Sequence, residues 1–391
     1  MFARTAGAVV LGLGLWSSTA MAQDTLKIGL IMAYSGPFAD TANQMQAGID
    51  LYLAKHGNEV AGKKIELIKK DTGGPNADVA KRLAQELVVR DGVDIIAGFT
   101  LTPEALGAAD VATEAKKFMV VMNAATSVVT EKSPYIARTS LTSPQVNYAF
   151  GKWAAEKGGV KQAYTLVADY GPGHDAESSF AKGFSEAGGK IVGADKTPVA
   201  NPDFSAFVQR VKDANPEAVY VFIPGGAQPP ALGKALAERG LTPPDTKLFG
   251  QGELTLPEAL ESMGDTAKGI ITTFHYTMER DDPINNEFVK GYRDANNGRS
   301  PDLFSIGGYD GMHLIFETLK KTNGDVSGDA LIEAAKGMAW DSPRGPISID
   351  PETRDIIQTV WIREVKEVDG KLQNVVIDQI ADVKDPLHGA K

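Results

Sequence analysis

The chain contains no cysteine, and this one absence excludes several kinds of chemistry. Without cysteine there are no disulfides, thiolate metal ligands, iron–sulfur clusters, thiol nucleophiles or cysteine-linked lipid anchors. Basic residues are also in the minority, because 40 Lys and Arg stand against 50 Asp and Glu, for a formal charge of −10. This acidic balance argues against a nucleic-acid partner, since phosphate backbones are bound by clustered Lys and Arg.

Long hydrophobic runs are also absent, since a membrane-spanning helix needs about 20 apolar residues. Near the start, Arg4 precedes a short apolar run over residues 6–16, and Ala20-Met21-Ala22 then gives the small–x–small pattern of a secretory cleavage site. We therefore expect residues 1–22 to be a signal peptide cleaved after Ala22. The rest of the chain is expected in a bacterial periplasm, with no membrane anchor.

Signatures of enzymes and metal sites are lacking as well. The sequence has no Gly-x-Ser-x-Gly nucleophile elbow, and its five histidines lie far apart, with no helical pair at metal-binding spacing. We therefore expect no catalytic activity, no metal and no cofactor. A secreted hydrolase, the alternative from another class, would need a nucleophile–base pair that the sequence does not display.

What the chain does have is an alternation of strand-like and helix-like segments along a length that suits two domains. It runs through strand 26–32, helix 41–56, strand 64–69, a helix after Asn76, strand 94–97, helix 104–116 and strand 118–122, and then restarts with helix 146–157 and strand 163–168. This rhythm predicts two α/β halves, each with a doubly wound, Rossmann-like parallel sheet. Near the end, Asp369-Gly370 between two strand-like segments predicts a β-hairpin.

Hydroxyl side chains follow two neighbouring predicted strands. The segment 98–104 contains Thr100, Leu101 and Thr102, and the segment 123–127 contains adjacent Thr126 and Ser127. Thr102 as the N-cap of a well-made helix is one interpretation. In the other, both loops offer hydroxyl and backbone N–H groups to a carboxylate beyond the carboxyl ends of the strands, with no cation needed.

The order and spacing of the motifs resemble the branched-chain amino-acid-binding type of periplasmic solute-binding protein, a leucine-binding-protein-like family that serves ABC importers. The motifs that carry the resemblance are Ile28-Gly29-Leu30, Tyr34-Ser35-Gly36-Pro37, Gly98 to Thr102, Asn123-Ala124-Ala125-Thr126, Asp169-Tyr170-Gly171 and Gly240-Leu241. It implies a class I (type I) binding-protein fold, with a ligand cleft between two lobes and three hinge crossovers near residues 138–140, 272–274 and 344–346. Residues 23–139 plus 273–345 are then expected in lobe 1, and residues 140–272 plus 346–391 in lobe 2.

The resemblance also implies roles for individual residues. Thr102 and Thr126 match residues that hold the ligand carboxylate, the carbonyl of Ala124 is expected to face a ligand amine, and Tyr170 is expected to line the other lobe. The complete set of expected ligand-binding residues is Tyr34, Phe38, Thr100, Leu101, Thr102, Asn123, Ala124, Ala125, Thr126, Tyr170, Gly225, Gly226, Gly252, Glu253 and His275.

The sequence departs from the family's amino-acid binders at two places. Gly252 occupies the position of the glutamate that pairs with the ligand ammonium, with Glu253 one residue later, and the segment 223–226 replaces an aromatic residue. This Pro-Gly-Gly segment and the segment 341–346 resemble relatives that bind aromatic carboxylates. The predicted ligand is therefore a small amphipathic carboxylate, with an amino acid and an aromatic acid both open. His275 fits either a cleft-lining or a structural role.

By this resemblance the chain is a monomer that captures its ligand by hinge closure and delivers it to the permease of an ABC importer. Presentation of the solute to a membrane receptor is an alternative that the sequence leaves open.

Overall fold

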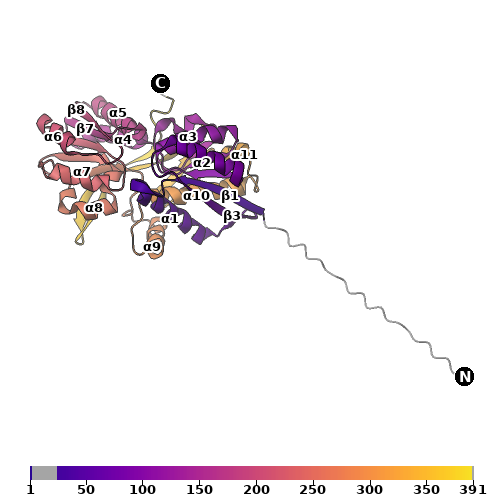
Figure 1. The fold of residues 1–391 in the computed structure, drawn as a ribbon. Coiled ribbons are helices and arrows are strands. Elements are labelled where there is room, and N and C mark those ends of the chain that lie inside the picture. Colours follow the sequence, from indigo (N-terminus) through magenta and orange to yellow (C-terminus); the bar gives the residue numbers. More distant parts are fainter. Residues whose placement is uncertain (2–23, 390–391) are drawn as a thin grey trace.

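A computed structural model describes Met1 and residues 24–389, so the expected signal peptide lies outside the described residues. The chain forms two α/β lobes that lie side by side, each with helices on both faces of a central sheet (Figure 1). The predicted fold class is confirmed.

The sheet of the first lobe has the strand order β2-β3-β1-β4-β5-β6. Its strands are β1 (Asp24–Met32), β2 (Glu59–Val60), β3 (Lys63–Asp71), β4 (Ile95–Gly98), β5 (Phe118–Val121) and β6 (Ile136–Arg138). Only β2 is antiparallel to its neighbour. The central strands β4 and β5 are buried at every residue, as expected for short apolar strands covered on both faces.

Helices from two distant parts of the chain cover this sheet. They are α1 (Ala39–His56), α2 (Ala77–Glu86), α3 (Thr102–Glu114), α9 (Pro283–Ala295), α10 (Leu303–Lys321) and α11 (Gly328–Ala335). Helices α2 and α3 share one hydrophobic core with the sheet, whereas α1 and α10 pack together in another. We call this sheet and these helices the first lobe.

The second lobe has the sheet order β12-β13-β14-β11-β10-β9-β7-β8, with β15 paired to β14. Its strands are β7 (Gln162–Ala168), β8 (Lys190–Thr197), β9 (Ala218–Phe222), β10 (Lys247–Gln251), β11 (Ile271–Phe274), β12 (Ala339–Ser342), β13 (Gly345–Ile349), β14 (Ile356–Val368) and β15 (Lys371–Val383). Strands β7 to β11 are parallel, and β12 to β15 add an antiparallel extension. Its helices are α4 (Ser143–Glu156), α5 (Gly171–Glu186), α6 (Ser205–Ala214), α7 (Gln228–Ala237) and α8 (Pro257–Met263).

Short helical turns complete the connections. They are the 3-10 turns Gly36–Phe38, Ser127–Lys132, Gly252–Thr255 and Gly264–Ala267, and a π-helical turn Leu87–Asp91 that continues α2. The predicted hairpin is confirmed at β14–β15, where Asp369 and Gly370 have φ of 50° and 74°. Two positive φ values in succession are the signature of a type I′ turn.

With β12 counted in the second sheet, the chain passes between the lobes after β6, after β11 and between α11 and β12, a few residues before the predicted third crossover. Two fully buried arginines form ion pairs and hydrogen bonds at the segments that connect the lobes. Arg138 pairs with Asp355 at 2.6 Å, and Arg344 pairs with Asp310 at 2.7 Å while donating to the carbonyl of Ser140 at 2.9 Å. The assignment of individual segments to lobes stays a prediction, since β12 hydrogen-bonds into the second sheet while Trp340 within it donates to Asp310 of α10.

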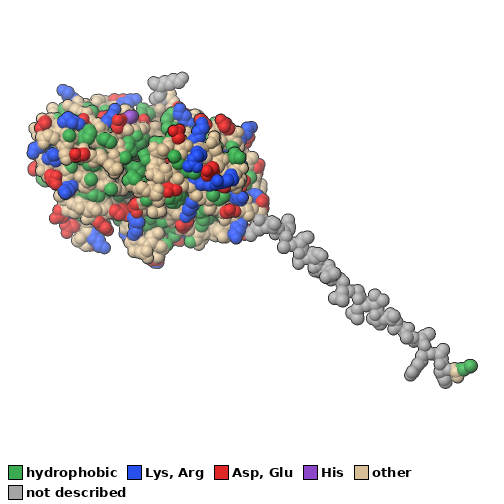
Figure 2. Space-filling model, viewed as in Figure 1, with side chains coloured by type: hydrophobic (Ala, Val, Ile, Leu, Met, Phe, Trp, Pro, Cys, Tyr) green, Lys and Arg blue, Asp and Glu red, His purple; other side chains and the backbone are tan. Residues whose placement is uncertain are grey.

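The C-terminal segment after β15 returns to the first lobe. Asp385 accepts a hydrogen bond from the hydroxyl of Ser127, and Glu131 accepts one from the N–H of Gly389 at 2.9 Å. None of the helices among the described residues is both long and apolar enough to cross a membrane. On the face in view, acidic and basic side chains are interspersed and hydrophobic ones gather between the lobes (Figure 2).

Candidate functional site

Two threonine hydroxyls meet at the carboxyl edge of the first sheet. The hydroxyl of Thr126 donates to that of Thr102 across 3.0 Å, and the two residues are only 7% and 3% exposed. Strands β4 and β5 are parallel neighbours, so the loops that follow them lie side by side. The sequence prediction that these two loops converge is borne out by this contact.

Thr102 is not the N-cap of α3, contrary to that interpretation of the sequence. It is the first helical residue, and Leu101 precedes it in extended conformation. The carboxylate of Glu104 accepts from the N–H of Leu101 at 3.0 Å and from the hydroxyl of Thr72 at 2.6 Å. Because Thr102 is already inside the helix, its hydroxyl does not cap α3, and Glu104 instead accepts from the N–H of the N-cap residue Leu101. Burial raises the pKa of Glu104 to about 7.

Other predicted ligand contacts in these loops instead hold the loops in place. Thr100 accepts from the N–H of Ala33 at 3.0 Å, and Asn123 donates to the carbonyl of Thr100 at 2.6 Å. The carbonyl of Ala125 accepts from the N–H of Ser143 at 2.8 Å. Phe99, just before Thr100, has φ of 70°, a backbone strain that clusters at binding sites in proteins.

The carbonyl of Ala124 is engaged by a cation. Arg138 Nη1 donates to it at 2.9 Å and to the carbonyl of Thr126 at 2.8 Å, and Arg138 Nη2 donates to the carbonyl of Ser127 at 3.2 Å. The expectation that Ala124 offers its carbonyl to a ligand amine stays a prediction, because Arg138 uses only one of the two lone pairs of this oxygen. Arg138 is also paired with Asp355, and it makes no hydrogen bond to the hydroxyls of Thr102 and Thr126, which bond to each other.

The two lobes touch at these hydroxyls. A Cβ on Gly171, the first residue of α5, would lie 2.5 Å from Thr126 Oγ1, and the N–H of Ser127 donates to Asp175 of the same helix at 2.8 Å. Tyr170, from the second lobe, packs against the cluster formed by Ala33, Phe38 and Leu101 of the first lobe. Burial raises the pKa of the Tyr170 hydroxyl above its usual range, so this group stays a hydrogen-bond donor.

Glu253 lies behind Tyr170 in the second lobe. Its Oε1 accepts from Gln251 at 3.0 Å, whereas its buried Oε2 has no hydrogen-bond partner among the described residues. Burial raises the pKa of Glu253 to about 7, and its charge in turn raises the pKa of Tyr170. Glu253 Oε2 therefore has no partner in the described part of the chain that would compete with a ligand, and Glu253 stays a predicted ligand-binding residue although it lies one position after the glutamate of the family's amino-acid binders.

His275 and Gly252 lie deeper, next to Phe274. His275 is fully buried, and neither of its ring nitrogens has a partner among residues 24–389. Burial and two nearby arginines, Arg344 and Arg363, lower its pKa well below the usual value, so the ring is neutral. Gly252 packs so closely against Phe274 that a Cβ would lie 2.2 Å from the ring. Close packing alone therefore explains why a glycine occupies this position.

Tyr34 is not brought to the paired threonines. Its hydroxyl donates to Gln46 of α1 at 2.8 Å, and Lys69 lies over its ring. Gly225 and Gly226 instead approach the first lobe near the cleft mouth, where a Cβ on Gly226 would lie 3.2 Å from the carbonyl of Pro37.

Several residues around the cleft were not predicted as functional from the sequence. They are Arg138, Asp175, Gln228 and Arg344. Arg138 and Arg344 had been placed at crossovers, but no local pattern reveals which backbone carbonyls they reach. Such contacts join residues far apart in the chain.

The arrangement is suited to binding an anion rather than to catalysis. It offers two hydroxyls beside the start of α3, which favours negative charge, whereas the N–H groups of Leu101, Thr126 and Ser127 already donate within the protein. No group of three or more metal-ligating side chains occurs among the residues that the structure describes.

Comparisons with known proteins agree with this geometry. A family model described as "Periplasmic binding protein" matches residues 25–371. The chain is 42% identical over 374 residues to "Leu/Ile/Val-binding protein homolog 6" of Brucella melitensis, covering 95% of both chains.

Two solved structures from Rhodopseudomonas palustris are also similar. A solute-binding protein of an ABC transporter in complex with 3,4-dihydroxybenzoic acid has 51% identity and a TM-score of 0.89, with 93% of this chain and 99% of that one covered. Another, in complex with 4-hydroxybenzoate, has 40% identity, the same TM-score of 0.89 and the same coverage. These relatives are solute-binding proteins rather than enzymes, and the chain belongs to the periplasmic binding protein family.

Proposed function

We propose that this protein captures a small aromatic carboxylate between its lobes, outside the cytoplasm, and delivers it to the permease of an ABC importer. The ligand carboxylate binds the hydroxyls of Thr102 and Thr126, and its ring lies against Tyr170 and Phe38. The solved relatives that bind hydroxybenzoates support this ligand class. The protein acts as a monomer, with lobe boundaries as expected from the sequence.

The position of Arg138 is the observation that favours an aromatic carboxylate over an amino acid as the ligand. Its guanidinium lies 2.9 Å from the carbonyl of Ala124, where an amino-acid ligand would place its ammonium. Arg138 is paired with Asp355, which partly offsets the repulsion between its guanidinium and an ammonium on the same carbonyl, but the ammonium would still have to share this oxygen with it. A ligand with a carboxylate and no amine avoids this repulsion.

A branched-chain amino acid is the second candidate, because one observation favours it. Glu253 keeps a buried carboxylate oxygen without a partner, and an ammonium would satisfy it. The curated relatives named for leucine, isoleucine and valine support the same alternative.

Capture follows from the way the lobes meet. The first lobe holds both threonines and binds the carboxylate first. The second lobe then swings about the crossovers and brings Tyr170 and the start of α5 onto the ligand, with Glu253 and His275 behind them. The permease distinguishes loaded from empty protein by this closure.

Thermal unfolding with a ligand panel tests the proposal. The panel contains benzoate, 4-hydroxybenzoate, 3,4-dihydroxybenzoate, 4-hydroxycinnamate, leucine and valine. A ligand present at about 100 times its Kd adds about 2.7 kcal/mol to the free energy of unfolding, which gives a clear rise in Tm. We expect this rise with aromatic carboxylates and not with leucine or valine.

Variants locate the site. The double substitution Thr102→Val and Thr126→Val removes both hydroxyls at nearly constant volume and should abolish the ligand-induced rise. Thr113→Val, on the same helix α3, serves as the matched control, because the Thr113 hydroxyl donates only to the carbonyl of Ala109. Undiminished binding by the double variant would refute the proposed carboxylate site, and a response to leucine alone would favour the second candidate.

A further inference from the structure

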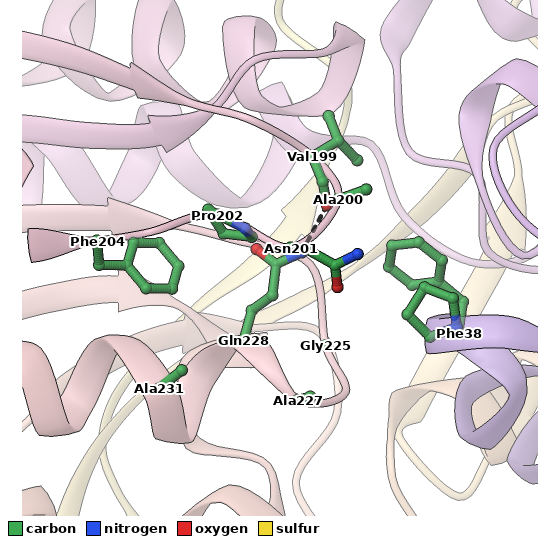
Figure 3. Close-up of a pocket in the computed structure, with 11 residues that line it drawn as sticks. Phe38, Val199, Ala200, Asn201, Pro202, Phe204, Gly225, Ala227, Gln228 and Ala231 are labelled. Atoms are coloured by element: carbon green, nitrogen blue, oxygen red, sulfur yellow. Dashed lines mark hydrogen bonds between the residues drawn. The ribbon is translucent and has the colours of Figure 1, made fainter.

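A cavity of about 170 Å³ lies between the two lobes at the mouth of the cleft. The first lobe contributes Pro37 and Phe38, and the second lobe contributes the segment 199–204, Gly225 and the start of α7. Figure 3 shows the ring of Phe38 on one side and the loop around Asn201 and the side chain of Gln228 on the other. The volume suits one aromatic ring, since an engineered apolar cavity of about 150 Å³ binds benzene.

The cavity adjoins the proposed carboxylate site. Phe38 lines the cavity and also packs with Leu101, the residue immediately before Thr102. Tyr170 and Val199 pack against the same cluster, and Val199 lines the cavity too. A ligand whose carboxylate lies at the threonines therefore has this cavity next to the aromatic wall that holds its ring.

The cavity wall carries one buried acceptor with a fixed orientation. Gln228, the first residue of α7, is 8% exposed, and its Nε2 donates to the carbonyl of Val199 at 2.6 Å. Because a carbonyl only accepts hydrogen bonds, the amide nitrogen must face Val199 and the amide oxygen must face away from it. This Oε1 is buried and has no partner among the described residues.

The other residues that line the cavity limit which ligand groups could donate a hydrogen bond to Gln228 Oε1. The other lining residues include no acidic or basic side chain, and Asn201 is the one polar side chain among them. A second ligand carboxylate would enter this neutral cavity as an unpaired charge facing a carbonyl oxygen, which is unfavourable. A neutral donor on an apolar ring, such as a phenolic hydroxyl, satisfies the acceptor without that cost.

We propose that Gln228 is a specificity-determining residue, whose Oε1 accepts a hydrogen bond from a ring hydroxyl of the ligand in this cavity. The inference rests on the proposed function and sharpens it from aromatic carboxylates to phenolic acids. A site built to pair with a hydroxyl rejects the analogue that lacks it, because its buried acceptor is then left unpaired.

Matched ligand pairs test this by calorimetric titration of the full protein. The pairs are 4-hydroxybenzoate with benzoate, and 4-hydroxycinnamate with cinnamate, each differing by one hydroxyl. The wild-type protein should bind the hydroxylated member about tenfold more tightly in at least one pair. Gln228→Met keeps the side-chain length but removes the acceptor. It should bring that ratio close to one by weakening the hydroxylated member only.

A control variant and distinct failure modes keep the test decisive. Gln209→Met on α6 is the control, because Gln209 is exposed and donates to Asp213 on its own helix, and it should leave both affinities unchanged. If the wild-type protein binds both members of both pairs equally well, the inference about Gln228 is wrong but the proposed function stands. This outcome is measured on the wild-type protein alone. A Gln228→Met protein that keeps the hydroxyl preference or loses affinity for both members alike would also overturn the inference. Binding of none of the four acids by the wild type would overturn the proposed function itself.

Discussion

At the residue scale, the most consequential side chains are polar groups that the fold buries without complete hydrogen bonding. Gln228 Oε1, Glu253 Oε2 and both nitrogens of His275 are of this kind. A folded protein seldom leaves a buried acceptor unpaired, since the missing hydrogen bond costs about 1–3 kcal/mol. Other buried groups without a hydrogen-bond partner among the described residues, such as the indole nitrogen of Trp361 in β14, lie elsewhere, but binding of a polar ligand between the lobes would satisfy Gln228 and Glu253.

Glu253 leads to a prediction about pH. Burial raises its pKa from 4.5 to about 7, so the folded protein keeps this proton over a range in which the unfolded chain releases it. Stability therefore falls as pH rises through this range, and the penalty is complete above pH 7, at about 3 kcal/mol. Glu253→Gln removes this titration. The difference in free energy of unfolding between the variant and the wild type should therefore shift in favour of the variant, by about 3 kcal/mol, as the pH rises from 5 to 8.

Urea unfolding of the ligand-free proteins at several pH values measures this shift. Glu261→Gln in the same lobe is the control, because Glu261 is exposed, and its difference from the wild type should stay constant over the same range. A constant difference between Glu253→Gln and the wild type would show that Glu253 is ionised in the folded protein at low pH.

At the scale of helices and strands, the alternating pattern predicted most of the architecture, and the misplaced boundaries have a common cause. The sequence pattern predicts helices over residues 176–187 and 312–322, but α5 and α10 begin five and nine residues earlier, at Gly171 and Leu303. Both starts are rich in glycine, which lowers helix propensity. In the fold these glycines permit close packing, because a Cβ on Gly307 would lie 2.2 Å from the carbonyl of Met122.

Some of the proposed binding residues could be predicted from the sequence, and others could not. Thr102 and Thr126 follow β4 and β5, which are parallel neighbours in this sheet, so the strand order brings them together. Arg138 and Gln228 act through carbonyls of Ala124 and Val199 in other loops. A single sequence holds no periodicity or motif for such a contact, because it depends on how the loops and lobes pack.

The start of α5 carries a prediction about the meeting of the lobes. A Cβ on Gly171 would lie 2.5 Å from Thr126 Oγ1, closer than real Cβ contacts, so Gly171→Ala obstructs closure over the ligand. Overpacking of this kind costs about 1–3 kcal/mol, and we expect ligand affinity to fall about tenfold or more. Calorimetric titration with the ligand found in the panel measures this loss.

The ligand-free protein can relieve this contact by opening at the crossovers, so its free energy of unfolding should fall by less than its free energy of ligand binding. Gly291→Ala in α9 is the matched control, since its nearest neighbour is a leucine methyl at an ordinary 3.4 Å, and it should bind normally. Unchanged affinity in Gly171→Ala would mean that the lobes do not need to approach this closely to hold the ligand.

At the scale of the whole molecule, the lobes are joined by crossovers and also by side-chain contacts across the cleft. The clearest is Glu258 of α8, which pairs with Arg299 of the first lobe at 3.1 Å and accepts from Gln44 of α1 at 3.4 Å. Arg299 also pairs with Asp40 at 2.9 Å, entirely within the first lobe. Arg299 thus has one acidic partner in each lobe, Asp40 in the first and Glu258 in the second. Substituting each acid separately distinguishes an effect on lobe closure from an effect on the stability of the first lobe.

Neutralising each acid in turn distinguishes the two partners. Glu258→Gln removes the attraction between lobes, so ligand affinity should fall by up to about fivefold at low salt, because an exposed pair contributes about 0.2–1 kcal/mol. The loss should disappear in 1 M salt, where the screening length is about 3 Å. Asp40→Asn leaves the pair between the lobes intact and should not weaken binding. Titrations of both variants at low and high salt measure these effects, and equal losses in both, or a loss that persists at high salt, would show that the pair does not act through closure.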